Sequence, residues 1–436
     1  MKKTSIEIIK KLKASGYEAY WAGGCVRDIL MGKDPKDYDI VTSAKPVEIE
    51  KTLNKTIPIG KKFGVILAIE KGHTFEVASF RSDAAYTDGR RPDAIYFTDA
   101  KEDAKRRDFT INGIFYDPIK KQIYDYVEGQ KDIESKTLRF IGNADERIKE
   151  DNLRILRAIR FRNALNFKYA GNTFNSVSKN AKLILNVSSE RVKDELEKIL
   201  LLPGRENAFL DLSRSGILEI ILPELIKLKG VKQPEKYHKE GDVFTHTLKA
   251  LEAIPNKASA ELVWAVLFHD VGKADTYKVK ERIRFDGHAE LGSKIFEEVA
   301  DRLKFSRNLK ENVSWLIRHH MMAGDVLKMK PSHQYSWVHN PLFKELVELL
   351  KYDELGSKPK DMSMYNSLKK LVENKEELLP QPTKLITGEE IINIFKVSEG
   401  PILGKLLKQV HDLQVDGKIN TKTEALKFVE KEIHGK

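Results

Sequence analysis

The sequence predicts a multidomain protein in which a mixed α/β domain, a small sheet covered by helices, is followed by all-helical domains. With 436 residues the chain is too long for one ordinary domain, and two to four domains are expected. Strand and helix signals alternate through residues 1–140. From about residue 144 the strand signals fade and helical patterns continue. These observations together predict an α/β domain joined to helical ones.

The elements of the first domain can be placed in order. The pattern predicts a helix, a strand ending in a glycine turn, a helix, a strand, a helix and a hairpin, over residues 1–16, 17–24, 26–32, 37–42, 46–54 and 64–80. The hairpin is expected to turn at Lys71 and Gly72. Together these elements give the small mixed sheet and its covering helices.

The later segments are helical, and breaks between them suggest domain boundaries. Helices are expected over 144–167, 188–202 and much of the histidine-rich stretch 216–360, with a break at 202–207 and a proline-marked linker at 379–384. We therefore expect four parts, with the bounds 1–143, 144–215, 216–360 and 361–436.

Composition narrows the class of protein. The formal net charge of +11 favours polyanionic partners, with nucleic acid first, although a high lysine content can also be a compositional habit. The single cysteine, Cys25, excludes an internal disulfide framework and fits a reducing cytoplasm, where we expect the protein to act. No segment approaches the roughly 20 uninterrupted apolar residues of a membrane span, so none is expected.

The stretch GGCVRDILMGKDPKDYDI, residues 23–40, combines acids with features that bind phosphate. In a strand, Asp37 and Asp39 project to the same side and Tyr38 to the other. Two carboxylates on one face repel unless a cation lies between them, and Mg²⁺ is the usual one; a second ion would give a two-metal site for phosphoryl transfer. The backbone N–H groups of the turn at Gly23 and Gly24 can approach a triphosphate.

Three further features extend this candidate site. Arg27, on the helix after the glycine turn, can add positive charge. Glu76 is the best candidate for a third carboxylate from a neighbouring strand, the alternative being a surface acid at an edge. The polar loop 81–97 reads either as a mobile lid that presents Arg90 and Arg91 or as a solvated loop.

The run KRRDFTING, residues 105–113, is basic and carries a second acid. If it is helical, Asp108 and Asn112 share a face and could hydrogen-bond a ribose hydroxyl, while Arg107 meets phosphate. Alternatively, the run is a salt-bridged helix start.

A helix expected over 150–162 carries a charged strip. At 100° per residue, Asp151, Arg154 and Arg157 lie on one side, away from a core stripe. An aspartate, which accepts hydrogen bonds, beside an arginine, which donates several, can match the Watson–Crick edge of a base. The alternative interpretation is a weak ion pair between neighbouring turns of the helix. That alternative does not explain why Arg160 and further arginines crowd the same helix, so we place Arg160 with the nucleotide-binding residues.

These motifs resemble those of the class II tRNA nucleotidyltransferase and bacterial poly(A) polymerase family, within the polymerase β superfamily. GGCVRD and DYDI resemble its catalytic motif, RRDFTING its ribose-sensing motif, YDYVEGQKDI the link between head and neck, EDNLRILRAIRF its base-template motif and SSERVKDELEKIL its neck-supporting motif. Gly113 stands where an alanine is usual. The resemblance covers essentially the whole chain.

The resemblance implies a polymerase β-like head followed by a helical neck, body and tail, and a role for each motif. Asp37 and Asp39 would hold Mg²⁺; Gly24 and Arg27 would bind the nucleotide, with Arg107 and Arg157 on or near its phosphates; Asp108 would read the ribose, and Asp151 and Arg154 would pair with cytosine or adenine. The tRNA 3′ hydroxyl would attack the α-phosphate of CTP or ATP and release pyrophosphate.

A histidine set in the third part resembles the HD phosphohydrolase superfamily. His269 and Asp270 form the histidine–aspartate pair, with His246 before them and Asp353 as the candidate for the remaining ligand. Imidazole and carboxylate ligands suit a transition metal. His288, His319 and His320 complete the set, but the last two lie about 100° apart on one helix and should not both reach one ion.

The sequence therefore favours a template-independent nucleotidyltransferase that adds CCA to tRNA. An A-adding enzyme and a poly(A) polymerase share its chemistry, and a metal phosphohydrolase acting on RNA ends or nucleotides is the alternative from another class. The full-length loop 81–97 resembles that of family members that add the terminal A. Sequence alone does not separate CCA from A-only addition, identify the metal of the histidine site or reveal how selection changes from C to A; it also leaves the oligomeric state open.

Overall fold

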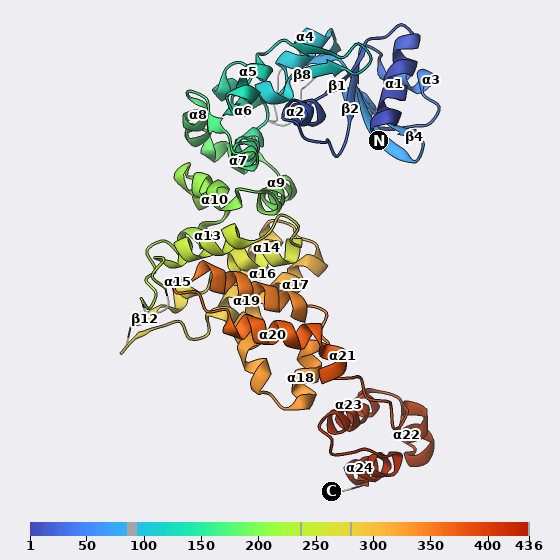
Figure 1. The fold of residues 1–436 in the computed structure, drawn as a ribbon, viewed down its shortest axis with the longest axis vertical. Coiled ribbons are helices and arrows are strands. Elements are labelled where there is room, and N and C mark those ends of the chain that lie inside the picture. The colour runs from blue at the N-terminus through green and yellow to red at the C-terminus, as the bar shows by residue number, and fades with distance from the viewer. Residues whose placement is uncertain (85–93, 236–237, 280, 435–436) are drawn as a thin grey trace. The chain divides into compact units, whose positions relative to one another are not determined.

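The computed structural model describes residues 1–84, 94–235, 238–279 and 281–434. It divides into two compact units, residues 1–226 with 302–304, and residues 227–301 with 305–436 (Figure 1). The first unit is mixed α/β and the second is almost entirely helical, as the sequence predicts. Within the described residues no helix is both long and apolar enough to cross a membrane.

The first unit is built around a seven-stranded mixed sheet with the order β3-β4-β5-β2-β1-β8-β9. Only β2 and β5 pair in parallel; the other neighbours are antiparallel. The strands are β1 (Ala19–Ala22), β2 (Asp39–Thr42), β3 (Thr56–Gly60), β4 (Val65–Glu70), β5 (His73–Ser79), β8 (Ile114–Asp117) and β9 (Gln122–Asp125). The predicted hairpin is confirmed, because Glu70 pairs with His73 and both turn residues have positive φ.

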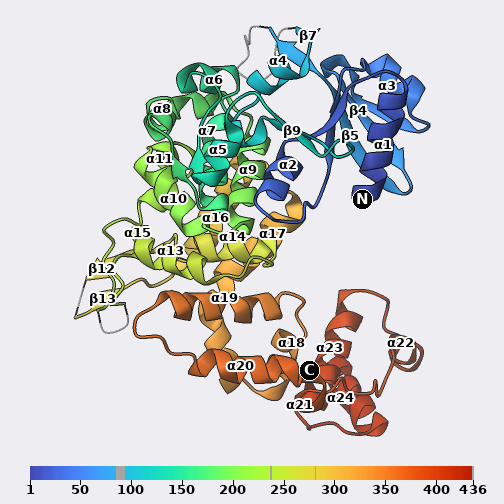
Figure 2. The same cartoon turned by 45° about the horizontal axis from the view of Figure 1, so that its top comes forward.

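Helices cover the sheet as the alternating pattern predicts. They are α1 (Lys2–Ala14), α2 (Gly24–Leu30), α3 (Pro46–Thr52), α4 (Ala100–Lys105) and α5 (Gly129–Glu134), with short 3-10 helices at η1 (Lys61–Phe63) and η2 (Thr110–Asn112). Helix α1 packs on α3 (Figure 2), and Ser5 of α1 accepts a hydrogen bond from Trp21 of β1 at 3.0 Å. Tyr20 points to the other face, where it joins a buried cluster with Ala100 and Ala104 of α4.

The strands β6 (Arg81–Asp83) and β7 (Ile95–Phe97) pair with each other beside the main sheet. They form the two ends of the segment 81–97, which the sequence predicts to be a loop throughout, so that prediction is wrong at both ends. Arg90 and Arg91, which the sequence places in that loop, lie outside the described residues.

The rest of the first unit is helical. Its elements are α6 (Ala144–Glu150), α7 (Arg154–Leu165), α8 (Thr173–Lys179), η3 (Ala181–Asn186), α9 (Ser189–Leu201), α10 (Arg205–Arg214), α11 (Ile217–Ile221) and α12 (Pro223–Ile226), with the two-residue strands β10 (Thr137–Leu138) and β11 (Lys168–Tyr169). Ile155, Leu156 and Ile159 of α7 are fully buried, which confirms the predicted core stripe.

Three local predictions differ from the structure. Strand β2 begins only at Asp39, so Asp37 precedes it. The run 105–113 is a helix end followed by a 3-10 turn, not a helix start. The single helix expected over 144–167 is two helices, because Asp151 is extended with φ −137° and ψ 104° and interrupts them. Its carboxylate accepts a hydrogen bond from the backbone N–H of Leu153, the competing local bond that acidic residues offer.

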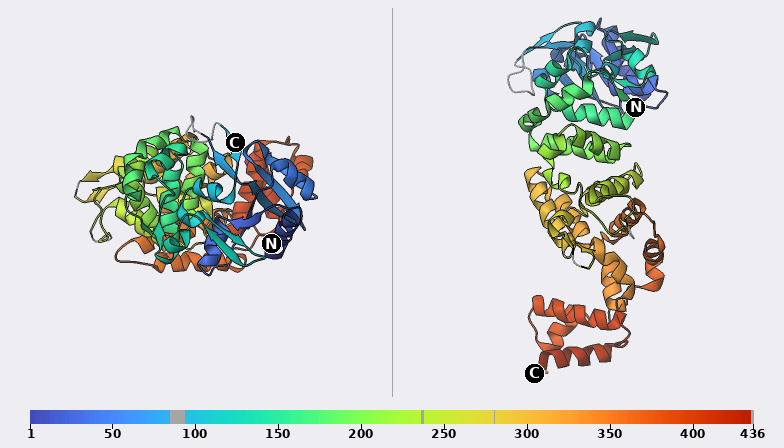
Figure 3. Two further views of the ribbon diagram at one scale, coloured as in Figure 1. Left: turned by 90° about the horizontal axis from the view of Figure 1, so that it is seen from above. Right: turned by 90° about the vertical axis from the view of Figure 1, so that its left-hand side faces the viewer.

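The second unit holds a helical bundle and a smaller terminal cluster. The bundle contains α13 (Val243–Ala253), α14 (Ala260–Phe268), α15 (Lys273–Thr276), α16 (His288–Arg302), α17 (Arg307–His319), η4 (His320–Lys328), α18 (Pro331–Val338), α19 (Phe343–Gly356), α20 (Ser363–Glu373) and α21 (Lys375–Leu378), with the hairpin β12 (Lys278–Val279) and β13 (Ile283–Arg284). The last helices, α22 (Gly388–Phe395), α23 (Pro401–Val415) and α24 (Lys422–His434), share an apolar core and pack on one another (Figure 3, in red).

Candidate active site and metal centre

Three carboxylates gather on one face of the main sheet. Asp39 begins β2 directly opposite Ala22 of β1. Because Val41 pairs with Ala78 in the parallel β2–β5 ladder, Asp39 and Glu76, two residues upstream of each, lie on the same face of neighbouring strands. Tyr38 points to the other side, as predicted, with its ring centroid 4.8 Å from that of Trp21.

The electrostatics of this face favour the binding of a cation. Partial burial and the nearby carboxylates of Glu76 and Asp37 together raise the pKa of Asp39 to about 6, against the opposing charge of Arg107. Within the described residues, none of the three carboxylates accepts a hydrogen bond or forms an ion pair through its side chain. Three neighbouring carboxylates that form no ion pair within the described part of the chain offer oxygen ligands suited to a hard divalent cation such as Mg²⁺.

The glycine turn brings backbone close to these charges. Gly23 has φ +69°, a conformation that other residues adopt only with strain, and it is the N-cap residue of α2. A Cβ at this position would lie 3.6 Å from Nη1 of Arg107 and 3.8 Å from Oδ2 of Asp39. At Gly24 a Cβ would lie 3.6 Å from Nη2 of Arg27. The turn therefore lies between the carboxylates and the two arginines.

A relay of hydrogen bonds joins the sheet to the following helices. Arg27 donates from Nη1 to Oδ1 of Asn112 at 2.9 Å, and Asn112 donates to Oδ1 of Asp108 at 3.1 Å. Arg157 of α7 donates from Nε to Oδ2 of Asp108 at 2.8 Å. Burial opposes ionisation of Asp108, but Arg157 lowers its pKa to about 2. Asp108 and Asn112 are thus neighbours, as predicted, although a 3-10 turn brings them together.

Arg107 is held by a buried carboxylate that sequence reasoning missed. Asp103 of α4 is fully buried and accepts hydrogen bonds from Nε and Nη2 of Arg107 at 3.2 and 3.1 Å. It also pairs with Arg106 at 2.7 Å and accepts from the backbone N–H of Arg81 at 3.2 Å. The spacing of Asp103 and Arg107, four residues apart along a helix end, was the available signal.

The predicted base-reading pair is engaged inside the protein. Nη1 of Arg154 donates to the backbone oxygen of Arg147 at 2.7 Å and to Glu150 at 2.6 Å, and the side chain is largely buried. Asp151 accepts two hydrogen bonds from Arg191 of α9, at 3.0 and 3.1 Å. The strip expected from helical periodicity does not form, because Asp151 precedes α7 and Arg154 is its first residue.

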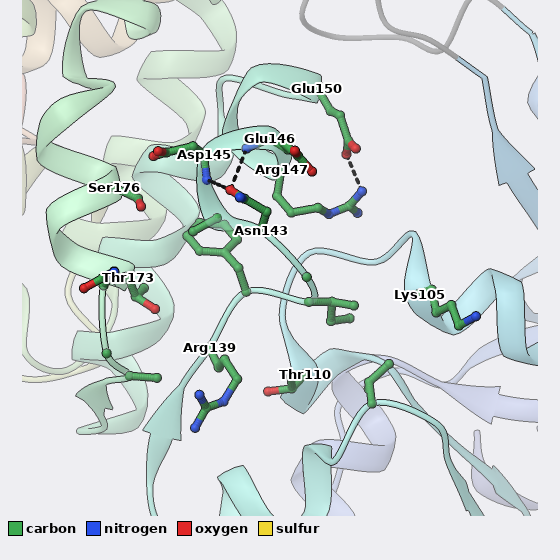
Figure 4. A pocket seen from close by; sticks show the side chains of 18 of the residues that line it. Lys105, Thr110, Arg139, Asn143, Asp145, Glu146, Arg147, Glu150, Thr173 and Ser176 are labelled. Carbon is green, nitrogen blue, oxygen red and sulfur yellow. Dashed lines mark hydrogen bonds and ion pairs between the residues drawn. The ribbon is translucent and has the colours of Figure 1, made fainter.

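A cavity of 810 Å³ lies beside this region and contains none of the three carboxylates. Figure 4 shows Asn143, which caps α6, and the ion pair between Arg147 and Glu150 at its rim. Arg147 also donates to the backbone oxygen of Arg107 at 2.8 Å. This wall of the cavity therefore supports the segment that carries Arg107 and Asp108.

A second group of charged side chains lies in the other unit. The ligand atoms of His246, His269 and Asp353 lie within 4.8 Å of one another, and so do those of Asp270, His288 and His320. Nε2 of His269 is 3.2 Å from Asp270 and 3.6 Å from Asp353. The six residues come from α13, the end of α14, α16, η4 and α19, so long-range packing brings them together.

The tautomers of the histidines suit metal binding. Nδ1 of His269, His288 and His320 each donates to a backbone carbonyl, of Val266, Phe285 and Ile317, at 2.8, 2.8 and 2.7 Å. In a neutral ring of this kind Nε2 presents a lone pair, and the Nε2 atoms of His288 and His320 are 3.2 Å apart. Against the effect of burial, Asp270 and Asp353 raise the pKa of His269 to about 10, so a metal ion would have to displace a proton from that ring. Burial lowers the pKa of His320 to about 4, which keeps that ring neutral. Facing lone pairs beside carboxylates fit one or more metal cations.

Two further residues contact this centre, and His319 and His320 do not both reach it, as expected. Glu240, buried and not predicted, contacts Nδ1 of His246 at 3.1 Å and leaves its Nε2 facing Asp353 at 2.9 Å. Lys273 lies 2.7 Å from Asp270. His319 instead stacks near Trp315, with ring centroids 4.6 Å apart, so only His320 of the adjacent pair reaches the centre.

A cavity of 760 Å³ opens over this centre. Asp270, His288, His320 and Asp353 line it together with the positively charged Lys273, Arg282 and Arg284. A metal centre beside a cavity that also carries cationic side chains can bind and activate a phosphate ester.

Comparisons with known proteins match the segments of the chain that carry the two sites. Family models match three consecutive segments: "Poly A polymerase head domain" at residues 19–139, "Probable RNA and SrmB- binding site of polymerase A" at 166–228 and "HD domain" at 243–355. The first segment contains the three carboxylates, and the third contains the six residues of the histidine centre.

Relatives match over nearly the full chain. A CCA-adding enzyme of Streptococcus mutans is 31% identical over 98% of this chain and 97% of its own length. One of Geobacillus thermodenitrificans is 35% identical over 73% of this chain and 74% of its own. The solved structure of the Bacillus stearothermophilus CCA-adding enzyme in complex with CTP superposes with a TM-score of 0.71 and 26% identity, covering 99% of this chain and 98% of that one.

Proposed function

The chain belongs to the family of CCA-adding enzymes, which are tRNA nucleotidyltransferases, and on this premise we propose that it adds CCA to the 3′ end of tRNA from CTP and ATP. The proposal rests on one observation: the carboxylates of Asp37, Asp39 and Glu76 lie close together, and no cationic side chain among the described residues forms an ion pair with them. Family members need a divalent metal, and this face is where the chain offers it oxygen donors.

We assign Mg²⁺ to these carboxylates, where it would polarise the triphosphate and help to ionise the attacking hydroxyl. Asp37 and Asp39 would be its ligands and Glu76 a third carboxylate from the adjacent strand. The N–H groups of the Gly23–Gly24 turn would lie along the triphosphate, with Arg27 and Arg107 on its oxygens. Asp108 and Asn112 would bind the ribose hydroxyl. The tRNA 3′ oxygen then bonds to the α-phosphorus, and pyrophosphate leaves.

Reading the base requires two internal bonds to be exchanged. Asp151 would leave Arg191, and Arg154 would turn from Glu150, so that an acceptor and a donor fork face cytosine or adenine. Arg157 and Arg160 would lie nearer the phosphates. The roles of these residues and the four-part division at 143, 215 and 360 are proposals that the continuous order of motifs supports. Action in the cytoplasm is also a proposal, supported by the single cysteine.

Asp39→Ala tests the carboxylate assignment. The variant should lose at least about a thousandfold in transfer of CMP and AMP, because a metal ligand is removed, while its affinity for tRNA stays close to wild type. Transfer is measured with labelled CTP or ATP on tRNAs that end before the first C, after CC or after CCA. Asp34→Ala, an exposed acid five residues upstream, is the matched control. Normal turnover of Asp39→Ala would remove the assignment.

The same tRNA panel separates the related activities. Extension of both incomplete tRNAs that stops at CCA supports the proposal. Extension of the CC tRNA alone supports an A-adding enzyme, and long oligo(A) products support a poly(A) polymerase.

A second function is favoured by the histidine centre. The convergence of four histidines with Asp270 and Asp353, beside a cavity that is also lined by Lys273, Arg282 and Arg284, supports metal-dependent hydrolysis of phosphate esters. Imidazole-rich ligands favour a transition metal such as Mn²⁺, Ni²⁺ or Zn²⁺ over Mg²⁺. Hydrolysis of p-nitrophenyl phosphate and of bis(p-nitrophenyl) phosphate, with each metal added in turn, tests this activity, and its absence with every metal would contradict it.

A further inference from the structure

One aromatic ring lies among three arginines of the nucleotide site. The guanidinium carbons of Arg27, Arg157 and Arg160 are 5.5, 5.3 and 4.1 Å from the ring centroid of Phe161. Arg27 belongs to α2, which packs on the sheet, whereas the other two belong to α7. Phe161 is 9% exposed. All three distances are within the roughly 6 Å range of cation–π attraction.

Three like charges this close together need compensation. Each guanidinium has one acidic partner: Asp28 for Arg27, Asp108 for Arg157 and Glu195 for Arg160. These acids occupy only part of each donor fork. Among the described residues, Nη1 of Arg157 and both Nη groups of Arg160 donate no hydrogen bond, so donors remain for a ligand.

The aromatic ring attracts the guanidinium groups in a way that the acids cannot. Its negative face attracts a guanidinium without using an N–H donor, so a cation can be held in place while its donors stay available. The ring itself is fixed from behind, because Phe109 meets its edge at 5.6 Å and 73° and stacks in turn near Phe140. Phe161 is therefore a rigid, water-excluding support between α2 and α7.

We propose that Phe161 is a positioning residue that holds Arg27, Arg157 and Arg160 for the triphosphate of the incoming nucleotide. The inference rests on the proposed nucleotidyltransferase function and adds to it a residue that touches neither substrate nor metal. It predicts an effect on nucleotide binding that is the same for CTP and ATP, because every nucleoside triphosphate carries the same three phosphates.

Phe161→Leu tests the inference by removing the ring while keeping an apolar side chain. The KM values for CTP and ATP should rise roughly tenfold, corresponding to the loss of more than one cation–π contact. The kcat should change much less, because these arginines bind ground state and transition state alike. Phe161→Tyr keeps the ring and should restore KM to within about twofold of wild type.

Two further variants separate positioning from packing. Phe209→Leu removes a fully buried ring from α10 of the same unit, which contacts no cation among the described residues. It should lower the melting temperature with KM unchanged. Phe161→Met fills similar volume with a flexible chain and should raise KM as Phe161→Leu does, which covers the case in which the leucine variant fails to fold.

Equilibrium binding of CTP in the presence of Mg²⁺, without tRNA, is measured by calorimetry alongside the kinetics. Weaker CTP binding in Phe161→Leu than in Phe209→Leu supports the inference even if wild type transfers no nucleotide, an outcome that would overturn only the proposed function. Equal KM and Kd in wild type and Phe161→Leu overturn the inference. So does an equal rise in both leucine variants, because it would reflect loss of packing alone.

Discussion

At the scale of single residues, Asp39 shows how position sets chemistry. Its pKa of about 6 lies well above the ordinary value of 3.8, because burial and two neighbouring carboxylates disfavour the charge. Alternation along a strand predicts that Asp37 and Asp39 share a side, but β2 begins only at Asp39, so the alternation does not extend to Asp37. The contribution of Glu76 depends on the parallel pairing of β2 with β5, which the sequence only suggested.

This environment predicts how nucleotide transfer depends on pH. The cation binds the ionised carboxylate, so the proton that the raised pKa retains must be lost first. Transfer should therefore be full above pH 7 and fall roughly tenfold per unit below pH 6 at low Mg²⁺. Because cation and proton compete, more Mg²⁺ should move the midpoint to lower pH. Initial rates of CMP transfer, measured across pH at several Mg²⁺ concentrations, check this. A half-maximal rate near pH 4 that does not change with Mg²⁺ concentration would contradict it.

Comparing Gly23 with Gly32 separates the effect of Gly23 on nucleotide binding from its effect on backbone strain. Gly23 and Gly32 flank the same helix with φ of +69° and +70°, but only Gly23 faces Arg107 and Asp39, whereas a Cβ at Gly32 would meet open space. Replacing either by alanine should cost about 1 kcal/mol of stability from backbone strain. Only Gly23→Ala should also raise the KM for CTP, severalfold, because its methyl group lies where backbone approaches phosphate. Thermal melts and steady-state kinetics of both variants measure the difference.

At the scale of elements, the break between α6 and α7 was the main error. A rotation of 100° per residue was extended through Asp151, although an Asp-Asn pair before an apolar run, here Asp151 and Asn152, is a signal for a helix start. Asp151 accepts a hydrogen bond from the backbone N–H of Leu153, which is the N-cap residue, and α7 begins at Arg154. The core stripe was predicted correctly because it lies wholly inside α7.

The position of Arg154 at the helix start leads to a test of specificity. Arg154→Ala should reduce the preference for CTP and ATP over GTP and UTP by roughly 10- to 100-fold, because a donor fork to the base is lost. Its bonds to Arg147 and Glu150 are lost as well, so the melting temperature should fall. Arg162→Ala, from the same helix but paired with Asp211, should keep the preference. Competition among the four nucleotides measures it; unchanged discrimination in Arg154→Ala would contradict a protein template.

At the scale of the whole molecule, the two candidate chemistries are in different units. The carboxylates of the sheet lie within residues 1–226, and the histidine centre lies within residues 227–436. They differ in donor type as well, oxygen in one and mainly imidazole in the other, so they should prefer different metals.

His269→Ala tests the independence of the two units. The variant should lose transition-metal binding and any phosphohydrolysis, because a buried ligand is removed, while CCA addition with Mg²⁺ stays within about twofold of wild type. Calorimetric titration with Mn²⁺ and the tRNA assay are run on the same preparation, with Asp39→Ala as the reciprocal variant. A stop of nucleotide addition in well-folded His269→Ala would show that the chemistries are not separate.

The sequence by itself determined the elements and the local motifs: the alternating strands and helices, the glycine turn before an acid pair, and the histidine–aspartate pair. These are set by periodicities and turn preferences that act over a few residues. Tertiary structure alone decided the partners, such as Arg191 for Asp151, Glu240 for His246 and three arginines for Phe161. Each guanidinium, imidazole or aromatic ring could interact with many different partners. Packing between segments that are distant in the chain decides which partner lies close to it.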